Sequence, residues 1–319
     1  MALLAPNLQI SRWIVAAGVN VREGRIEVPG GSVWYRVVGD SQATPLVVIH
    51  GGPGATHDYL EPLEALADER PVVFYDQLGA GKSDAPDDIE LWTNERLIDE
   101  LGRILDGLAV GKAHLLGQSW GTIIATEYAL RTPERLASLI LANPALSLPR
   151  YAAATTALRS ALPPDVRAVL DRHEAAGTTD SEEYQEASME FYSRHVCRLD
   201  PWPDPLMRTF NQMNQAIYER MQGPSEFQIT GIYKDYDVTD RLGELTLPTL
   251  FLCGRHDEMR PEDTAWYHSL VPGSELVIFE ESSHVPHLEE PERFLQVLRD
   301  FLRRGEKTPA DTRSRTHRS

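Results

Sequence analysis

The sequence contains few cysteines, few basic residues and no long apolar runs. Its two cysteines, Cys197 and Cys253, show no spacing typical of a disulfide framework or a metal site, so we expect a reduced, cytoplasmic setting. The chain has no run of about 18 apolar residues, and residues 1–20 lack the basic start of a signal peptide. We therefore expect neither a transmembrane helix nor a secretion signal.

Positive charge is scarce as well, since 31 basic residues face 48 acidic ones and the formal net charge is −17. This excess of negative charge argues against nucleic acid and anionic membranes as partners. No group of histidine, cysteine, aspartate or glutamate has convincing metal-ligand spacing, and we expect no metal or other cofactor. The hydrophobic content of 42% over 319 residues suits one large globular domain with an insertion, or two small domains.

Apolar runs alternate with helical patterns along the first part of the chain. Residues 25–38 form a predicted hairpin around a Pro-Gly-Gly turn. Continuous apolar runs, typical of buried parallel strands, lie at residues 45–49, 71–75, 113–116 and 136–141, with helices expected near 59–68, at 94–108 and from 121 onward. This alternation predicts a mostly parallel, doubly wound α/β sheet whose functional loops follow the carboxyl ends of the strands.

The pattern changes after residue 144. Helix formers, charges and aromatic residues dominate until about residue 240, and strands resume at 248–252 and 275–279 before a final amphipathic helix at 291–304. We therefore expect a sheet domain built from residues 1–144 and 241–304, a helical cap from 145 to 240, and a disordered tail at 305–319.

The sharpest signal is Gly117-Gln118-Ser119-Trp120-Gly121, which lies between a predicted strand and a predicted helix. A serine at such a turn is held in a strained conformation with its oxygen exposed. The two glycines let the strand and the helix approach each other without Cβ clashes. We predict that Ser119 is a nucleophile.

A serine hydroxyl needs a base, and the base needs a carboxylate that orients it. In this architecture the acid and then the histidine follow the serine along the chain. Asp257 and His284 come after the last two predicted strands in that order, and we assign them as acid and base. Glu258 is the alternative acid and His287 the alternative base.

The tetrahedral intermediate also needs two N–H donors for its oxyanion. The first is expected from Trp120, the residue after the nucleophile, and the second from the glycine-rich loop at residues 50–54. We choose Gly52 as the second donor because the backbone must approach the substrate closely there. Pro53 fixes this turn and helps to aim the donor.

Five motifs together resemble the proline iminopeptidases, which are serine aminopeptidases with the α/β-hydrolase fold. They are His50-Gly51-Gly52-Pro53-Gly54, Asp76-Gln77-x-Gly79-x-Gly81-x-Ser83, Gly117-Gln118-Ser119-Trp120-Gly121, Gly254-Arg255-x-Asp257, and His284 followed by Glu289-Glu290-Pro291. The resemblance implies an α/β-hydrolase fold with a helical cap inserted into the sheet domain.

The cap is similar to that of the tricorn-interacting aminopeptidase branch, on the residues Tyr218, Gly223-Pro224-Ser225-Glu226-Phe227, Thr230-Gly231 and Asp237-Val238-Thr239-Asp240. This similarity implies that Glu226 and Glu258 bind the amino terminus of the substrate, which leaves Asp257 as the catalytic acid. An α-amine has a pKa near 8, so its charged form needs opposing carboxylates when it is buried. Tyr218 either hydrogen-bonds near the reacting carbonyl or packs within the cap.

The sequence departs from the family pattern at Leu78, where an arginine is usual, and at Thr122, where a third glycine is common. Neither change removes a catalytic group, but strict proline specificity is in doubt because relatives include L-amino acid amidases and proline-amide hydrolases. We predict a serine hydrolase that releases an N-terminal proline or small apolar residue from short peptides or amino acid amides through an acyl-enzyme. The alternatives are an amide hydrolase without peptidase activity, a carboxylesterase or C–C hydrolase, and a non-catalytic binding protein; the oligomeric state stays open.

Overall fold

An eight-stranded sheet forms the centre of the structure, a computed structural model that describes residues 18–306. The strand order is β1-β2-β4-β3-β5-β6-β7-β8, in which β2 is antiparallel to both of its neighbours, β1 and β4, and every other pair is parallel. The strands are β1 Val21–Val28, β2 Gly31–Val38, β3 Leu46–Ile49, β4 Val72–Tyr75, β5 Ala113–Gln118, β6 Leu136–Ala142, β7 Thr249–Gly254 and β8 Glu275–Phe279. The predicted hairpin and the mostly parallel sheet are confirmed.

Helices cover both faces of this sheet because successive strand residues point to opposite sides. Val47 and Ile49 pack in one core with α1 (Asn94–Gly107), α2 (Gly121–Arg131) and α8 (Pro261–Leu270). Leu46 and Val48 pack in the other core, against α10 (Pro291–Glu306) and the segment Asp58–Asp68. The parallel strands are therefore buried on both faces, as their continuous apolar sequences predict.

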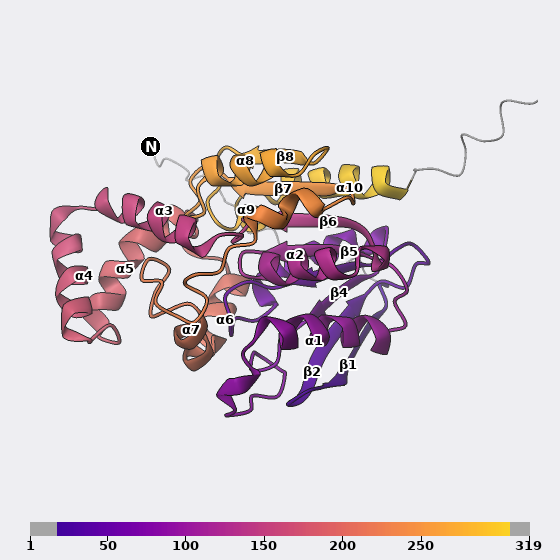
Figure 1. The fold of residues 1–319 in the computed structure, drawn as a ribbon, viewed down its shortest axis with the longest axis horizontal. Helices are drawn as coiled ribbons and strands as arrows, with labels where there is room; N and C mark the ends of the chain where they lie inside the picture. Colours follow the sequence, from indigo (N-terminus) through magenta and orange to yellow (C-terminus); the bar gives the residue numbers. More distant parts are fainter. Residues whose placement is uncertain (1–17, 307–319) are drawn as a thin grey trace, which may run out of the picture.

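Five α-helices lie between β6 and β7 in the chain, and the outer ones, α3, α4 and α5, project away from the sheet in Figure 1. The five are α3 Leu148–Ser160, α4 Pro164–Ala176, α5 Glu182–His195, α6 Asp204–Gln212 and α7 Gln215–Met221. The outer helices have a small apolar core of their own, in which Leu170, Tyr184, Phe191 and Phe227 are buried. We call the whole segment between β6 and β7 the helical insertion.

The segment Asp58–Asp68 is a 3-10 helix, η1, and not the α-helix that we expected near residues 59–68. Pro62 lies inside it and has no N–H to donate to a helical hydrogen bond. At the other end of the chain α10 continues to Glu306, and the rest of the tail predicted as disordered lies outside the described residues. Within residues 18–306 no helix combines the length and apolar character that a membrane crossing requires.

Parallel pairing brings the ends of distant strands to one edge of the sheet. Ile49 at the end of β3 pairs with Gly117 near the end of β5, and Ala142 at the end of β6 pairs with Leu252 of β7. The loops that follow β3, β5, β6 and β7 therefore meet at the same edge.

Candidate active site

Ser119 occupies the turn between β5 and α2 with a positive φ of 53°, a conformation that a non-glycine residue adopts at an energetic cost. Its N–H donates to the carbonyl of Ala142 at 2.9 Å, which fixes the turn against β6. A Cβ at Gly117 would lie 2.4 Å from the carbonyl oxygen of Gly121, and one at Gly121 would lie 2.3 Å from that of Ile49. The glycines predicted on steric grounds are thus required by the packing of this turn.

The two side chains assigned as acid and base are hydrogen-bonded to each other. The Nδ1 atom of His284 lies 2.7 Å from Oδ1 of Asp257, and Asp257 is 1% exposed. Since a carboxylate can only accept, Nδ1 carries the proton and Nε2 of the neutral ring remains an acceptor. This is the tautomer that a general base needs.

Asp257 is held by two further donors. The side-chain amide of Asn143 donates to Oδ2 at 2.6 Å, and the N–H of Met259 donates to Oδ1 at 3.0 Å. Asn143 follows β6 and was not among our predicted site residues. The sequence signal that could have revealed it is its position, because a polar residue that ends a buried parallel strand faces the functional edge of the sheet.

Burial and charge act in opposite directions on His284. Burial lowers the pKa of the imidazole, but the charge and the hydrogen bond of Asp257 outweigh it, and the net effect is a pKa raised above the ordinary 6.5. A base with a raised pKa takes a proton from the serine hydroxyl more readily.

Ser119 and His284 border the same cavity, but no hydrogen bond joins their side chains in the described structure. Catalytic hydrogen bonds are often long in free enzymes and shorten when the substrate binds. The three predicted triad residues therefore lie together. The hydrogen bond from the Ser119 hydroxyl to His284 is expected to form when substrate binds.

The two predicted oxyanion donors are available. Among the described residues, the backbone N–H groups of Gly52 and Trp120 have no acceptor. Gly52 has a φ of +44°, and the loop before it is anchored by His50. The Nε2 atom of His50 accepts from the N–H of Gln77 at 3.0 Å, and its Nδ1 atom lies 2.9 Å from the carbonyl oxygen of Gly51.

A buried network, absent from our sequence-based site, links the three catalytic loops. The Nε2 atom of Gln118 donates to the carbonyl of His284 at 3.0 Å, and its Oε1 atom accepts from the hydroxyl of Tyr59 at 2.5 Å. The same hydroxyl accepts from the N–H of Gly51 at 2.7 Å. The nucleophile turn, the histidine loop and the oxyanion loop are thereby held in register.

Replacing Tyr59 by phenylalanine should lower kcat by about tenfold, because two buried hydrogen-bonding groups lose their partner at a cost of about 1–3 kcal/mol. KM should change little, since the lost hydroxyl contacts the N–H of Gly51 and the side chain of Gln118, and neither Glu226 nor Glu258. Steady-state kinetics on an aminoacyl p-nitroanilide tests this, with Tyr35→Phe as the matched control. An unchanged kcat in Tyr59→Phe would refute the role of the network.

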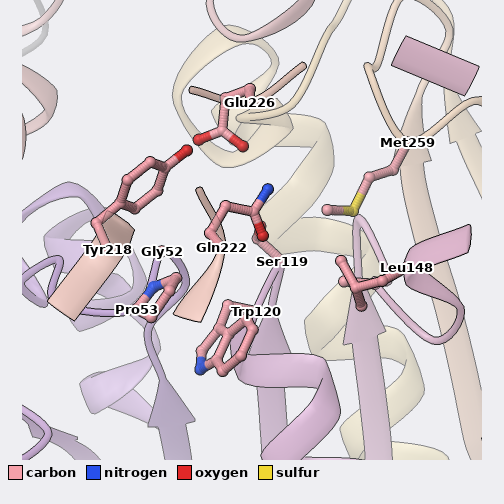
Figure 2. Close-up of a pocket in the computed structure, with 10 residues that line it drawn as sticks. Gly52, Pro53, Ser119, Trp120, Leu148, Tyr218, Gln222, Glu226 and Met259 are labelled. Carbon is pink, nitrogen blue, oxygen red and sulfur yellow. The ribbon is translucent and has the colours of Figure 1, made fainter. Parts of the chain in front are cut away.

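Glu226 comes from the helical insertion and Glu258 from the loop after β7, and both border one cavity with Ser119. The hydroxyl of Tyr151 donates to Oε2 of Glu226 at 2.8 Å, and the Tyr218 hydroxyl lies beside the same carboxylate (Figure 2). A Cβ on Gly223 would lie 2.1 Å from the carbonyl oxygen of Gln228, so only glycine fits in the turn that presents Glu226.

Glu258 is 1% exposed, and its Oε2 atom makes no hydrogen bond to any described residue. Its other oxygen lies 3.9 Å from Nε2 of His284. Burial, together with the negative charges of Glu226 and Asp257, raises the pKa of Glu258 well above its usual 4.5. A buried carboxylate with an unused acceptor next to a second carboxylate can accept a cation, because a positive charge there relieves the repulsion between the two.

Two cavities meet at the nucleophile, and both include Gly52, Ser119 and Glu226 in their walls. The first cavity comprises about 280 Å³, including space open to solvent, and Figure 2 shows it between Trp120, Leu148 and Met259. The second encloses about 440 Å³, including space open to solvent, and it alone includes His284.

The alternative base, His287, is engaged elsewhere. Its Nε2 atom lies 3.1 Å from the carbonyl oxygen of Tyr59, and burial lowers the pKa of His287 to about 3. The alternative acid, Glu258, does not reach Nδ1 of His284, where Asp257 is already bound. The geometry favours Asp257 and His284 over both alternatives.

The two departures from the family pattern are both buried. The hydroxyl of Thr122 donates to the carbonyl of Ser119 at 2.6 Å and accepts from the N–H of Ala145 at 2.9 Å, so it ties the nucleophile turn to the segment after β6. Leu78 is 2% exposed, and its N–H donates to Glu100 at 3.2 Å.

One group of residues in the described part of the chain, His57, Asp58 and Glu61, has ligand atoms close enough together to hold a metal ion. Arg208 pairs with both acidic side chains, and Nδ1 of His57 lies 2.8 Å from Asp76. These partners account for the cluster without a metal.

Comparisons with known proteins agree with this geometry. The model of the α/β hydrolase fold family matches residues 44–291. The proline iminopeptidase of Heyndrickxia coagulans is 44% identical over 283 residues, which cover 88% of this chain and 98% of that protein. The crystal structure of a proline iminopeptidase from Mycobacterium smegmatis has a TM-score of 0.82 at 38% identity and covers 89% of this chain and 99% of that one.

The crystal structure of VinJ is similar too, with a TM-score of 0.86, 43% identity and coverage of 89% of this chain and 98% of that chain. The relatives are matched over nearly their whole length, and the helical insertion is included in the match. On the fold, the assembled side chains and these similarities together, the chain belongs to the proline iminopeptidase family of the α/β hydrolases.

Proposed function

We propose that this protein is a serine exopeptidase that removes an N-terminal proline, or a small apolar residue, from short peptides and from amino acid amides. The observation that carries the proposal is Glu258, a fully buried carboxylate with an unused oxygen beside Glu226 and close to the triad. A protonated α-amine held there would place only one residue between itself and the scissile bond. The cut would then fall after the first residue.

The proposed reaction follows from the positions of the side chains. Ser119 attacks the carbonyl, and His284 takes the hydroxyl proton and passes it to the departing amine while Asp257 stabilises the charged imidazole. The N–H groups of Gly52 and Trp120 receive the oxyanion. Water activated by His284 then releases the amino acid from Ser119.

The cavity bordered by Trp120, Leu148 and Met259 supports a small apolar first residue. The apolar side chains that border it suit a pyrrolidine ring or a short alkyl group. Names of relatives at 44% and 38% identity, both proline iminopeptidases, support proline as the preferred residue.

Blocking the substrate amine tests the proposal. Alanyl and prolyl p-nitroanilides should be hydrolysed, and their N-acetyl derivatives should lose at least about 100-fold in kcat/KM, because an uncharged amide leaves Glu226 and the buried Glu258 without a cation. A carboxylesterase would accept the acetylated substrates. Equal rates with free and acetylated substrates would therefore refute an amine-binding role for Glu226 and Glu258.

Replacing Glu258 by glutamine should lower kcat/KM for the free-amine substrates by about 100-fold, since losing one partner of a buried charge pair costs about 2–5 kcal/mol. The variant keeps the shape of the side chain, and Glu262→Gln, at an exposed position in α8, is the matched control. Discrimination between free and acetylated substrates should shrink in Glu258→Gln alone. A variant that discriminates as well as wild type would contradict the proposal.

The pH dependence of kcat/KM should be bell-shaped. Activity falls as the pH drops because His284 must be neutral and Glu258 ionised, and the pKa of each group is raised, so the acidic midpoint should lie above 6.5. The alkaline limb should reflect loss of the substrate ammonium near pH 8. An acidic midpoint below 6.5 in a pH-rate profile would contradict the assigned environment of His284.

We propose that residues 145–240 act as a cap on a sheet domain made from residues 1–144 and 241–304. The free and buried thiols of Cys197 and Cys253 support a reduced, cytoplasmic setting. The expected partner is a small peptide or amino acid amide, and the acidic chain gives no support to nucleic acid or membrane binding.

A further inference from the structure

The two glutamates of the proposed amine site share a neighbour, the hydroxyl group of Tyr151. Tyr151 belongs to α3 and comes one turn after Leu148, which borders the first cavity, and residues three apart lie on the same face of a helix. The side chain is buried, with 3% of its surface exposed. Its hydroxyl donates to Oε2 of Glu226 at 2.8 Å and lies beside the carboxyl group of Glu258. One phenol therefore connects a carboxyl group of the helical insertion with one of the sheet domain.

A phenol hydroxyl has one proton to donate, and its oxygen can accept another. Burial and the charges of Glu226 and Glu258 raise the pKa of Tyr151 well above its usual 10, so the phenol keeps its proton. Because that proton goes to Glu226, the phenol oxygen has only lone pairs left for Glu258. A protonated Glu258 can donate to them, whereas an ionised one can only accept. If the hydroxyl turns to Glu258, the two glutamates exchange roles, and the three groups are again fully hydrogen-bonded with one proton on the pair.

The surroundings of the pair supply little positive charge. Among the described residues, no lysine or arginine borders either of the two cavities that include Glu226. The other titratable groups that face Glu258 are Asp257 on its own loop, the phenols of Tyr192 and Tyr218, and His284. Of these only the imidazole can become a cation, and its Nε2 atom lies 3.9 Å from Oε1 of Glu258. Without substrate, a proton on the pair or on His284 has to offset the two carboxylates.

The positive charge that the substrate brings changes this balance. Burial and the charges of Glu226 and Asp257 raise the pKa of Glu258 well above its usual 4.5, so it takes up a proton at a pH where an exposed glutamate is ionised. A substrate ammonium beside Glu258 favours its ionised form, as an opposite charge close to a carboxyl group does in general. The ammonium and the proton therefore compete for the same pair of carboxyl groups.

We propose that Tyr151 is a positioning residue of the amine site: it joins Glu226 and Glu258 into one unit that holds a proton in the free enzyme and releases it when the substrate ammonium binds. The proton passes to the solvent, and the net charge of the site is unchanged because one positive charge replaces another. This inference rests on the proposed exopeptidase function and adds to it the state of the amine site before substrate arrives.

Tyr151→Phe removes the shared hydroxyl and keeps the ring. We expect kcat/KM for prolyl p-nitroanilide to fall by about tenfold through a higher KM, with kcat nearly unchanged, because the hydroxyl holds a group that binds the amine. Discrimination against the N-acetylated substrate should shrink by a similar factor. Tyr236→Phe is the matched control, since its hydroxyl donates to Glu127, which borders neither cavity. A loss confined to kcat, or equal losses in both variants, would overturn the role of Tyr151.

The released proton can be counted with L-prolinol, which has the ring and the amine of proline and no bond that the enzyme can hydrolyse. Calorimetry in two buffers with different ionisation enthalpies gives the number of protons released per ligand bound. An ammonium also repels a proton on His284, so the measurement uses His284→Gln, whose side chain does not titrate. Between about pH 5 and 8 the release should pass through a maximum of more than about half a proton, because over part of this range the free pair is protonated and the occupied pair ionised.

A second substitution in the same background identifies the group that holds the proton. Adding Glu258→Gln should bring the release close to zero, whereas adding Glu262→Gln, at the exposed position in α8, should leave it unchanged. Release that survives Glu258→Gln, or no release in His284→Gln, overturns the inference. If L-prolinol competes with prolyl p-nitroanilide but releases no proton, the inference fails and the exopeptidase function stands. If it does not compete, and acetylated substrates are hydrolysed as fast as free ones, the proposed function itself fails.

Discussion

Replacement of Ser119 by alanine is expected to reduce kcat toward prolyl p-nitroanilide by a factor on the order of 10⁵ to 10⁶, the scale found when a serine nucleophile is removed. The strained backbone at Ser119, with a φ of 53°, serves only to present the hydroxyl at the edge of the sheet. Alanine fits the same turn without a clash. The variant should therefore fold and still bind substrate, and the loss should lie in kcat.

A fluorophosphonate probe gives a second measurement of the same residue. It should label the wild-type enzyme at Ser119 and fail to label Ser119→Ala, whereas Ser160→Ala, an exposed change at the end of α3, should be labelled and active like wild type. Turnover by Ser119→Ala at the wild-type rate would remove the basis for a serine mechanism.

Replacement of Asp257 by asparagine is expected to reduce kcat by about 10⁴-fold, as loss of the orienting carboxylate does in serine proteases. Asp257 accepts three hydrogen bonds, from His284, Asn143 and the N–H of Met259. An asparagine side chain would turn one acceptor into a donor, so either His284 adopts the wrong tautomer or the amide faces that of Asn143. The imidazolium formed during the reaction would also lose its counter-charge.

The pH profile separates these effects from misfolding. In Asp257→Asn the pKa of His284 should fall, because Asp257 raises it more than any other group does, and the residual activity should persist to lower pH. Asp235→Asn, on an exposed loop of the helical insertion, is the matched control and should behave like wild type. A residual profile identical to that of wild type would show that Asp257 does not set the state of His284.

Local sequence signals were sufficient for the strands of the sheet. Apolar runs of four to seven residues become the parallel strands because only a strand buried on both faces tolerates such continuity. The turn at Ser119 could be predicted too, because the constraint lies within five neighbouring residues. The 3-10 character of η1 could have been suspected from Pro62, which interrupts the helical hydrogen bonding.

The network of Tyr59, Gln118 and His284 could not be predicted in the same way. It depends on residues separated by 59 and 166 positions in the chain, and no periodicity encodes which side chains meet once the loops converge. Asn143 is an intermediate case. Its place after β6 predicts that it lies at the functional edge of the sheet, but not that its partner is Asp257. The cavities depend on how α6 and α7 are seated, which is a property of tertiary packing.

Asn214 precedes α7, the helix that carries Tyr218, and it binds two loops of the sheet domain at once. Its N–H donates to the carbonyl of Gly54 at 2.9 Å, and its side-chain amide donates to that of Gly79 at 2.8 Å. An outward movement of α7 would have to break both hydrogen bonds or displace the loop at residues 50–54, which positions the N–H of Gly52. Peptides must consequently reach Ser119 while this helix stays in place. The distance between the proposed amine-binding carboxylates and the Ser119 hydroxyl then stays the same from one substrate to the next.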